Sequence, residues 1–162
     1  MKLVIAIAII IVVLFLSLSL SSTKIVTTKV TDGSNPITME LGVYQDSDCG
    51  MVIDSLEYAS QVISDNKAWF FHDHGGMVKW LDTKEFKTTA TIWVMSRDTH
   101  EWIDGRVAFY SDDELTPMEY GFGAYRDKKD NFIDFKEMSL RVLRGETLQN
   151  PIIKKQKYHG NN

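Results

Sequence analysis

Residues 58–95 read YASQVISDNKAWFFHDHGGMVKWLDTKEFKTTATIWVM, and this stretch decides the fold class. Two runs rich in apolar and β-branched residues, 58–63 and 67–71, flank a Ser-Asp-Asn turn, which is typical of a pair of strands. After a Gly-Gly break, apolar residues recur at helical spacing, which predicts a short helix over about 76–85. A run rich in Thr, Ile, Trp and Val predicts a strand over 88–95. The order is strand-strand-helix-strand.

The same order is predicted further along the chain. The expected elements are strands over 101–110 (with a bulge at Gly105) and 121–126, a helix over 127–137 and a strand over 140–143. The chain thus contains a weak internal repeat of about 45 residues, with halves at about 45–96 and 100–146. Each half is too small to bury a sufficient core alone, so we expect the two to pack together. The predicted fold class is α+β.

Three flanking segments lie outside this repeat. Residues 3–20 contain only Ala, Val, Ile, Leu, Phe and two serines, a length near the lower limit for a membrane span. Residues 1–22 are therefore predicted to be a secretory signal peptide or an uncleaved anchor. Either would place the folded domain, residues 45–146, on the periplasmic side of the inner membrane. Residues 23–44 are predicted to be a polar tether and residues 147–162 a frayed polar tail.

The charge balance argues against nucleic acid as a partner. The 162-residue chain has a net charge of −4, and Lys2 is the only charged side chain before Lys24. The remainder holds 17 basic and 22 acidic side chains, a net charge of −5. Proteins that bind nucleic acid usually present a basic face, which this composition does not favour.

The sharpest local motif is Cys49-Gly50-Met51, which contains the single cysteine of the chain. In an extended segment the side chains of Cys49 and Met51 point to the same side, and the intervening glycine leaves room for close approach. Thiolate and thioether are soft ligands that together select Cu(I) over hard cations. A buried apolar cysteine beside a core methionine explains the same triplet, so this pattern leaves both interpretations open.

Other candidate ligands lie further along the chain. Met118 follows Thr116-Pro117 in an acidic loop, and it is a candidate third soft ligand or a loop anchor. His72 and His74 lie on one side of an extended run and are candidate metal ligands. Met77 follows the Gly-Gly turn and is a weaker candidate, since it also fits a core position.

An enzyme is less well supported. Cys49 with His72 or His74 could form a thiol dyad, but the sequence has no nucleophile elbow, P-loop or zincin motif. We therefore expect no catalytic residues.

Four blocks follow one another along the chain: Cys49-Gly50-Met51, Trp69-Phe70-Phe71-His72-Asp73 with a helix opening at Gly76, His100-Glu101-Trp102-Ile103-Asp104, and Thr116-Pro117-Met118-Glu119-Tyr120-Gly121-Phe122. In this order the blocks resemble the nitrous oxide reductase accessory protein NosL family. The resemblance runs from about residue 48 to about residue 148. It implies two small strand-strand-helix-strand units, related in fold to part of organomercurial lyase.

The resemblance also implies a function. Members of the family are membrane-tethered copper chaperones outside the cytoplasm, which bind one Cu(I) and deliver it toward the copper-sulfide centre of nitrous oxide reductase. By this resemblance Cys49 and Met51 are copper ligands, with Met118 a further soft ligand. The expected partners are nitrous oxide reductase or its membrane assembly complex, and the membrane itself through the N-terminal segment.

The chain departs from the family in two ways. Many members carry a lipid-bearing cysteine upstream, which this chain lacks, so the apolar N-terminus would take its place. The run from His72 to His74 is richer in histidine than the usual acidic version, which leaves a histidine ligand open. The alternative class is a metal-independent binding module that docks on a membrane-associated assembly.

Overall fold

The computed structural model describes residue 7, residues 10–13 and residues 26–159. Most of the apolar N-terminal segment, predicted to be a signal peptide or anchor, lies outside these residues. Among the residues that are described, no helix is long and apolar enough to cross a membrane.

The predicted α+β class is confirmed: two antiparallel sheets pack with helices. The larger sheet has the order β1-β3-β2-β4-β5 and the smaller has the order β7-β6-β8. The strands are β1 (Thr28–Val30), β2 (Ser60–Ser64), β3 (Lys67–Phe71), β4 (Thr91–Met95), β5 (Trp102–Asp104), β6 (Phe109–Tyr110), β7 (Ala124–Tyr125) and β8 (Ile133–Asp134). The helices are α2 (His74–Asp82), the 3-10 helix η1 (Glu85–Thr88), α3 (Phe135–Arg144) and α4 (Pro151–His159).

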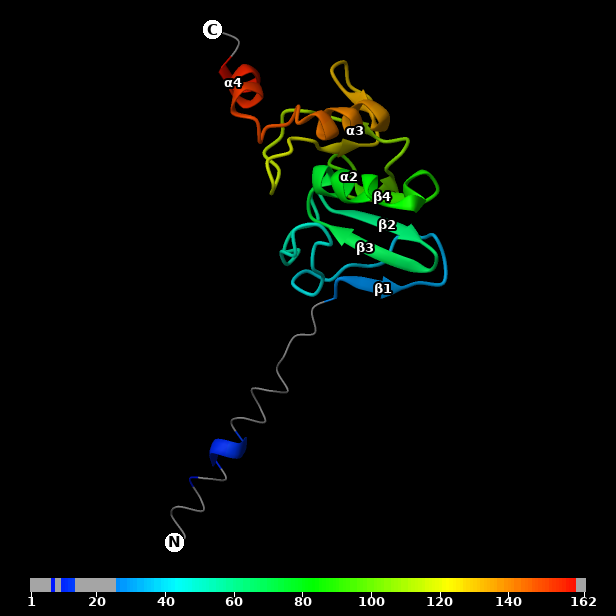
Figure 1. The fold of residues 1–162 in the computed structure, drawn as a ribbon, viewed down its shortest axis with the longest axis vertical. Helices are drawn as coiled ribbons and strands as arrows, with labels where there is room; N and C mark the ends of the chain where they lie inside the picture. Colours follow the sequence, from blue (N-terminus) through cyan, green and yellow to red (C-terminus); the bar gives the residue numbers. More distant parts are fainter. Residues whose placement is uncertain (1–6, 8–9, 14–25, 160–162) are drawn as a thin grey trace.

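The first predicted half has the expected order. β2 and β3 form a hairpin in which Asp65 and Asn66 adopt the left-handed conformation, with φ of 48° and 60°. Aspartate and asparagine tolerate this region better than most residues, which explains the turn. α2 lies against β2 and β3, and α3 packs on α2 (Figure 1). The buried face of α2 carries Met77, Val78 and Leu81, which join the main core.

The second predicted half differs from the expected order. The helix predicted over 127–137 begins only at Phe135, and the strand predicted over 140–143 lies inside α3. Asp134 caps this helix by accepting a hydrogen bond from the Glu137 amide at 2.8 Å. Met138 and Val142, four residues apart, are its buried positions. The apolar spacing is therefore helical, and no strand-strand-helix-strand unit forms here.

The strand predicted over 101–110 is also divided. It forms β5, which extends the larger sheet beside β4, and β6, which belongs to the smaller sheet. Gly105 lies between them rather than at a bulge, and its amide donates to the Ile92 carbonyl at 2.8 Å. A Cβ atom there would lie 2.7 Å from the Ile92 side chain, so the close approach requires glycine.

The segment predicted to be a tether is part of the fold from residue 26 onward. β1 pairs with β3 at one edge of the larger sheet, and Val26 forms a bridge with Tyr44. Met39 and Tyr44 are buried in a second core that covers Phe70 on the face opposite α2. The segment was predicted to be a tether because most of its residues are polar, but a few apolar side chains attach it to the second core.

Much of the predicted polar tail is also folded. Leu148 is buried, and α4 follows it. Lys154 forms an ion pair with Glu119, and Lys157 forms one with Asp112. These contacts hold α4 over the loop between β6 and β7.

Candidate functional site

The loop that carries Cys49 is a tight turn organised by Asp46. The Asp46 amide donates to the Met51 carbonyl at 2.8 Å, and the Gly50 amide donates to the Asp46 carbonyl at 3.0 Å. The Asp46 carboxylate accepts hydrogen bonds from the amides of Asp48 and Cys49, at 2.7 and 3.0 Å. Gly50 has a φ of 77°, which favours glycine.

This turn corrects the expectation that residues 49–51 are extended. Cys49 and Met51 are nevertheless both exposed, so neither is a core residue. The interpretation of the triplet as a buried cysteine beside a core methionine is therefore wrong. An exposed thiol two residues from a thioether that is 45% exposed remains compatible with a soft-metal site.

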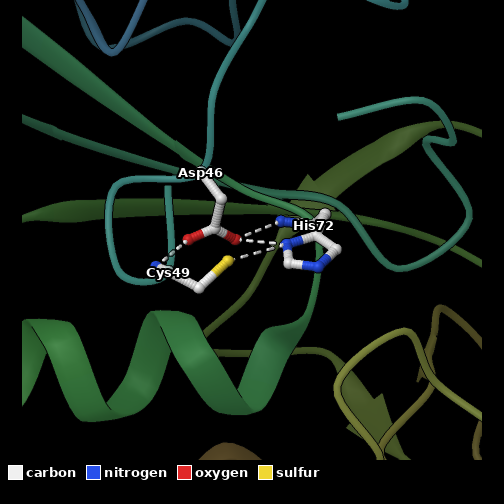
Figure 2. A group of neighbouring side chains, drawn as sticks. All are labelled: Asp46, Cys49 and His72. Atoms are coloured by element: carbon white, nitrogen blue, oxygen red, sulfur yellow. Dashed lines mark hydrogen bonds and ion pairs between the residues drawn. The ribbon is translucent and has the colours of Figure 1, made fainter. Parts of the chain in front are cut away.

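His72, just after β3, faces this loop. Its backbone amide donates to Asp46 Oδ2 at 2.8 Å, and its ring Nδ1 lies 2.5 Å from the same oxygen. Nδ1 also lies 3.9 Å from the Cys49 sulfur (Figure 2). One potential ligand atom from each of Asp46, Cys49 and His72 lies within 4.8 Å of the other two.

The hydrogen bond to Asp46 determines which nitrogen of the His72 ring carries the proton. An ionised carboxylate can only accept hydrogen bonds, so Nδ1 donates to Asp46. The other ring nitrogen, Nε2, is buried and has no hydrogen-bond partner among the described residues. A buried nitrogen without a partner is costly, and metal-binding sites are one setting where such atoms occur.

The pKa values follow from this cluster. Burial favours a higher pKa for Asp46, but hydrogen bonds from His72, Cys49 and Asp48 outweigh it and lower the pKa. Burial favours a lower pKa for His72, but the hydrogen bond and the charge of Asp46 outweigh it and raise the pKa. Burial raises the pKa of Cys49, and the charges of Asp46 and Asp48 add to this shift. The free thiol is therefore protonated at neutral pH.

His74 does not join this cluster. It is fully buried, and its Nδ1 lies 2.7 Å from the Ser60 hydroxyl, with Tyr58 and Tyr110 packed edge-on around the ring. Burial lowers its pKa to about 3. The prediction that His72 and His74 share one side fails because the chain turns into α2 between them.

Met77 and Met118 occupy different environments. Met77 is fully buried in the main core, which supports its interpretation as a core residue. Met118 is half-buried, and its backbone amide donates to Asp73 Oδ2 at 2.9 Å. The Met118 loop is therefore attached to the residue next to His72.

An open groove of about 550 Å³ adjoins the Cys49 loop. Beside the 46–50 turn it is lined by Thr27, Thr28, Trp69, Trp80 and Lys84. The Lys84 ammonium lies 4.4 Å from the centre of the Trp80 ring, a cation-π contact. The thiol is thus accessible from a surface that another molecule can approach.

Sequence reasoning did not identify Asp46 as part of the site. The available signal was local: Asp46 lies two residues before Asp48 and three before Cys49, whose amides it caps, and this spacing is typical of an Asx turn. Its contact with His72, 26 residues away, has no local signature. Comparison with protein-family models, with curated proteins and with solved structures finds no match for this chain.

Proposed function

We propose that this protein is a Cu(I)-binding chaperone whose site is built on Cys49. The observation that carries the proposal is the exposed Cys49 thiol 3.9 Å from His72 Nδ1, with the exposed thioether of Met51 two residues further on. Metal–sulfur and metal–nitrogen bonds of about 2.3 and 2.0 Å span this separation, so one ion fits between the two atoms once Nδ1 has given up the proton that it donates to Asp46.

The donor types favour Cu(I). A thiolate, an imidazole and a thioether are soft or intermediate ligands, and few ligands leave an open position for exchange with an acceptor. Asp46 is a hard ligand that suits divalent ions better, but three backbone amides already occupy its oxygens. The role of Asp46 in this proposal is to hold Cys49 and His72 in place through the hydrogen bonds that their backbone amides donate to its carboxylate.

The direction of delivery rests on the resemblance of the sequence to the NosL family. By that resemblance the acceptor is nitrous oxide reductase or its membrane assembly complex. The chain would work on the periplasmic side of the inner membrane, either anchored by its apolar N-terminus or secreted after cleavage. The groove beside Cys49 offers an acceptor a route to the metal.

The test is competition for Cu(I) against a chelator of known affinity, under anaerobic conditions. We expect Cys49→Ser and Met51→Leu each to weaken binding by about tenfold or more, because each removes one soft donor. Met138→Leu is the control, since Met138 is fully buried in α3 and the exchange nearly conserves volume. Unchanged affinity in Cys49→Ser would exclude this site.

Metal-uptake measurements on the same proteins distinguish the Cu(I) chaperone from two other functions. The Asp46, Cys49 and His72 cluster also suits Zn(II), which binds thiolate, imidazole and carboxylate. Stoichiometric zinc retained against a mild chelator, with no Cu(I) uptake, would favour a zinc site. No uptake of either ion would favour the metal-independent binding module. A thiol enzyme is disfavoured because the pKa of Cys49 is raised rather than lowered.

A further inference from the structure

We propose that Asp73 is a positioning residue of the copper site, whose carboxylate holds the Met118 loop beside the segment that carries His72. The inference rests on the proposed function, because it concerns how a third sulfur reaches the same ion. It assigns a role to a buried side chain that belongs to neither the Cys49 turn nor its hydrogen bonds.

The contacts of Asp73 join two distant parts of the chain. The side chain is fully buried between His72 and the first turn of α2. One carboxylate oxygen accepts a hydrogen bond from the Gly75 amide at 3.0 Å, which caps the helix. The other accepts one from the Met118 amide at 2.9 Å, 45 residues further along.

The neighbours of Cys49 and Met118 reach the same turn of α2. A Cβ atom on Gly76 would lie 3.4 Å from an Asp48 carboxylate oxygen and 4.0 Å from the Tyr120 ring. Asp48 precedes Cys49, and Tyr120 is two residues after Met118. The two loops therefore meet at the start of α2, against the only pair of adjacent glycines in the sequence.

The backbone of Met118 is held by hydrogen bonds on both sides of the residue, and its half-buried side chain packs at the margin of the main core. Gln149 donates a second hydrogen bond, to the Met118 carbonyl, at 2.7 Å. A methionine side chain has three rotatable bonds, so in this proposal its thioether leaves the margin of the core and turns toward the ion while the backbone stays in place. Loss of the Asp73 contact would remove the hydrogen bond that ties this loop to the His72 segment, and fixing the position of Met118 on metal binding would then cost more conformational entropy.

Asp73→Asn tests this role selectively. Asparagine keeps one oxygen to cap α2, but the nitrogen that replaces the other oxygen only donates and cannot accept a hydrogen bond from the Met118 amide. We expect Cu(I) affinity to fall by about tenfold in chelator competition, the size typical when a residue that orients a ligand is lost. Asp134→Asn, which changes the matching cap of α3, is the control and should bind as wild type.

Two further readouts distinguish positioning from a general loss of stability. Met118→Leu should cost the same factor as Asp73→Asn, and the double variant should bind no more weakly than either single variant. X-ray absorption should show one fewer sulfur neighbour of copper in both single variants. If Asp73→Asn does not fold, Asp73→Ser retains a short capping oxygen and loses the reach to Met118.

The outcomes separate this inference from the function on which it rests. Wild-type affinity in Asp73→Asn, or losses that multiply in the double variant, would overturn the role of Asp73. Wild-type affinity in Met118→Leu would overturn it as well, while a loss in Cys49→Ser would leave the copper site standing. Wild-type affinity in Cys49→Ser would instead overturn the proposed function.

Discussion

The burial of His74 makes the stability of the protein depend on pH. The ring is fully buried, and burial lowers its pKa to about 3, whereas an exposed histidine titrates near 6.5. Below that ordinary pKa the unfolded chain binds a proton at this residue that the folded protein does not. Protonation therefore stabilises the unfolded state, and the stability contributed by neutral His74 is lost as the pH falls.

We therefore expect the free energy of unfolding to fall by about 1.2 kcal/mol between pH 6 and pH 5 on account of His74. Urea titrations of wild type and His74→Leu at both pH values measure the difference between their slopes. His72 has a raised pKa, so its stabilising effect is lost as the pH rises above this window and does not interfere. Equal slopes in the two proteins would contradict the expectation.

The first turn of the helix α2 contains a position, Gly75, where no side chain fits. A Cβ atom on Gly75 would lie 2.0 Å from Cγ of the buried Tyr120 ring. The glycine pair, predicted to be a break between elements, lies inside the helix. It lets the loop after Met118 pack directly on the first turn.

Gly75→Ala is expected to lower the free energy of unfolding by about 1–3 kcal/mol, the usual cost of forcing extra atoms into a packed site. The midpoint of urea unfolding measures the change. Gly33→Ala is the matched control, since nothing lies within 4 Å of the added Cβ and its φ is not left-handed. A midpoint for Gly75→Ala equal to that of wild type would mean that Tyr120 moves aside at little cost.

At the scale of the whole molecule, the residues before the predicted domain complete the larger sheet. β1 covers one edge of that sheet, and Met39 and Tyr44 close the core on the face opposite α2. Tyr44 packs on Phe70 with ring centres 4.3 Å apart. Removal of this segment would expose Phe70, which is fully buried.

A protein lacking residues 1–44 should therefore be less stable than one lacking only residues 1–24. We expect a difference of about 3–6 kcal/mol, since two large apolar side chains contribute roughly 1.5–3 kcal/mol each when buried. Chemical denaturation of the two shortened proteins measures it. Equal midpoints would show that residues 26–44 act as a tether after all.

The amino-acid sequence by itself determined the elements whose signals are local. Runs rich in apolar and β-branched residues, a Ser-Asp-Asn turn and helical spacing predicted β2, β3, α2 and β4, because these patterns depend on residues close together in the chain. It also marked Cys49 and Met51 as candidate soft donors, but it left open whether they were buried and placed them in an extended segment rather than a turn.

Only the tertiary structure decided which distant residues meet. His72 joins Cys49 through Asp46, while His74, two residues away, is enclosed by the core, and no local pattern distinguishes the two rings. Asp73 reaches Met118 across 45 residues in the same way. The helix α3 was misread because a short apolar run fits a strand or a helix until its burial against α2 selects one face. Contacts between distant residues depend on packing of the whole chain, and packing has no counterpart in a local stretch of sequence.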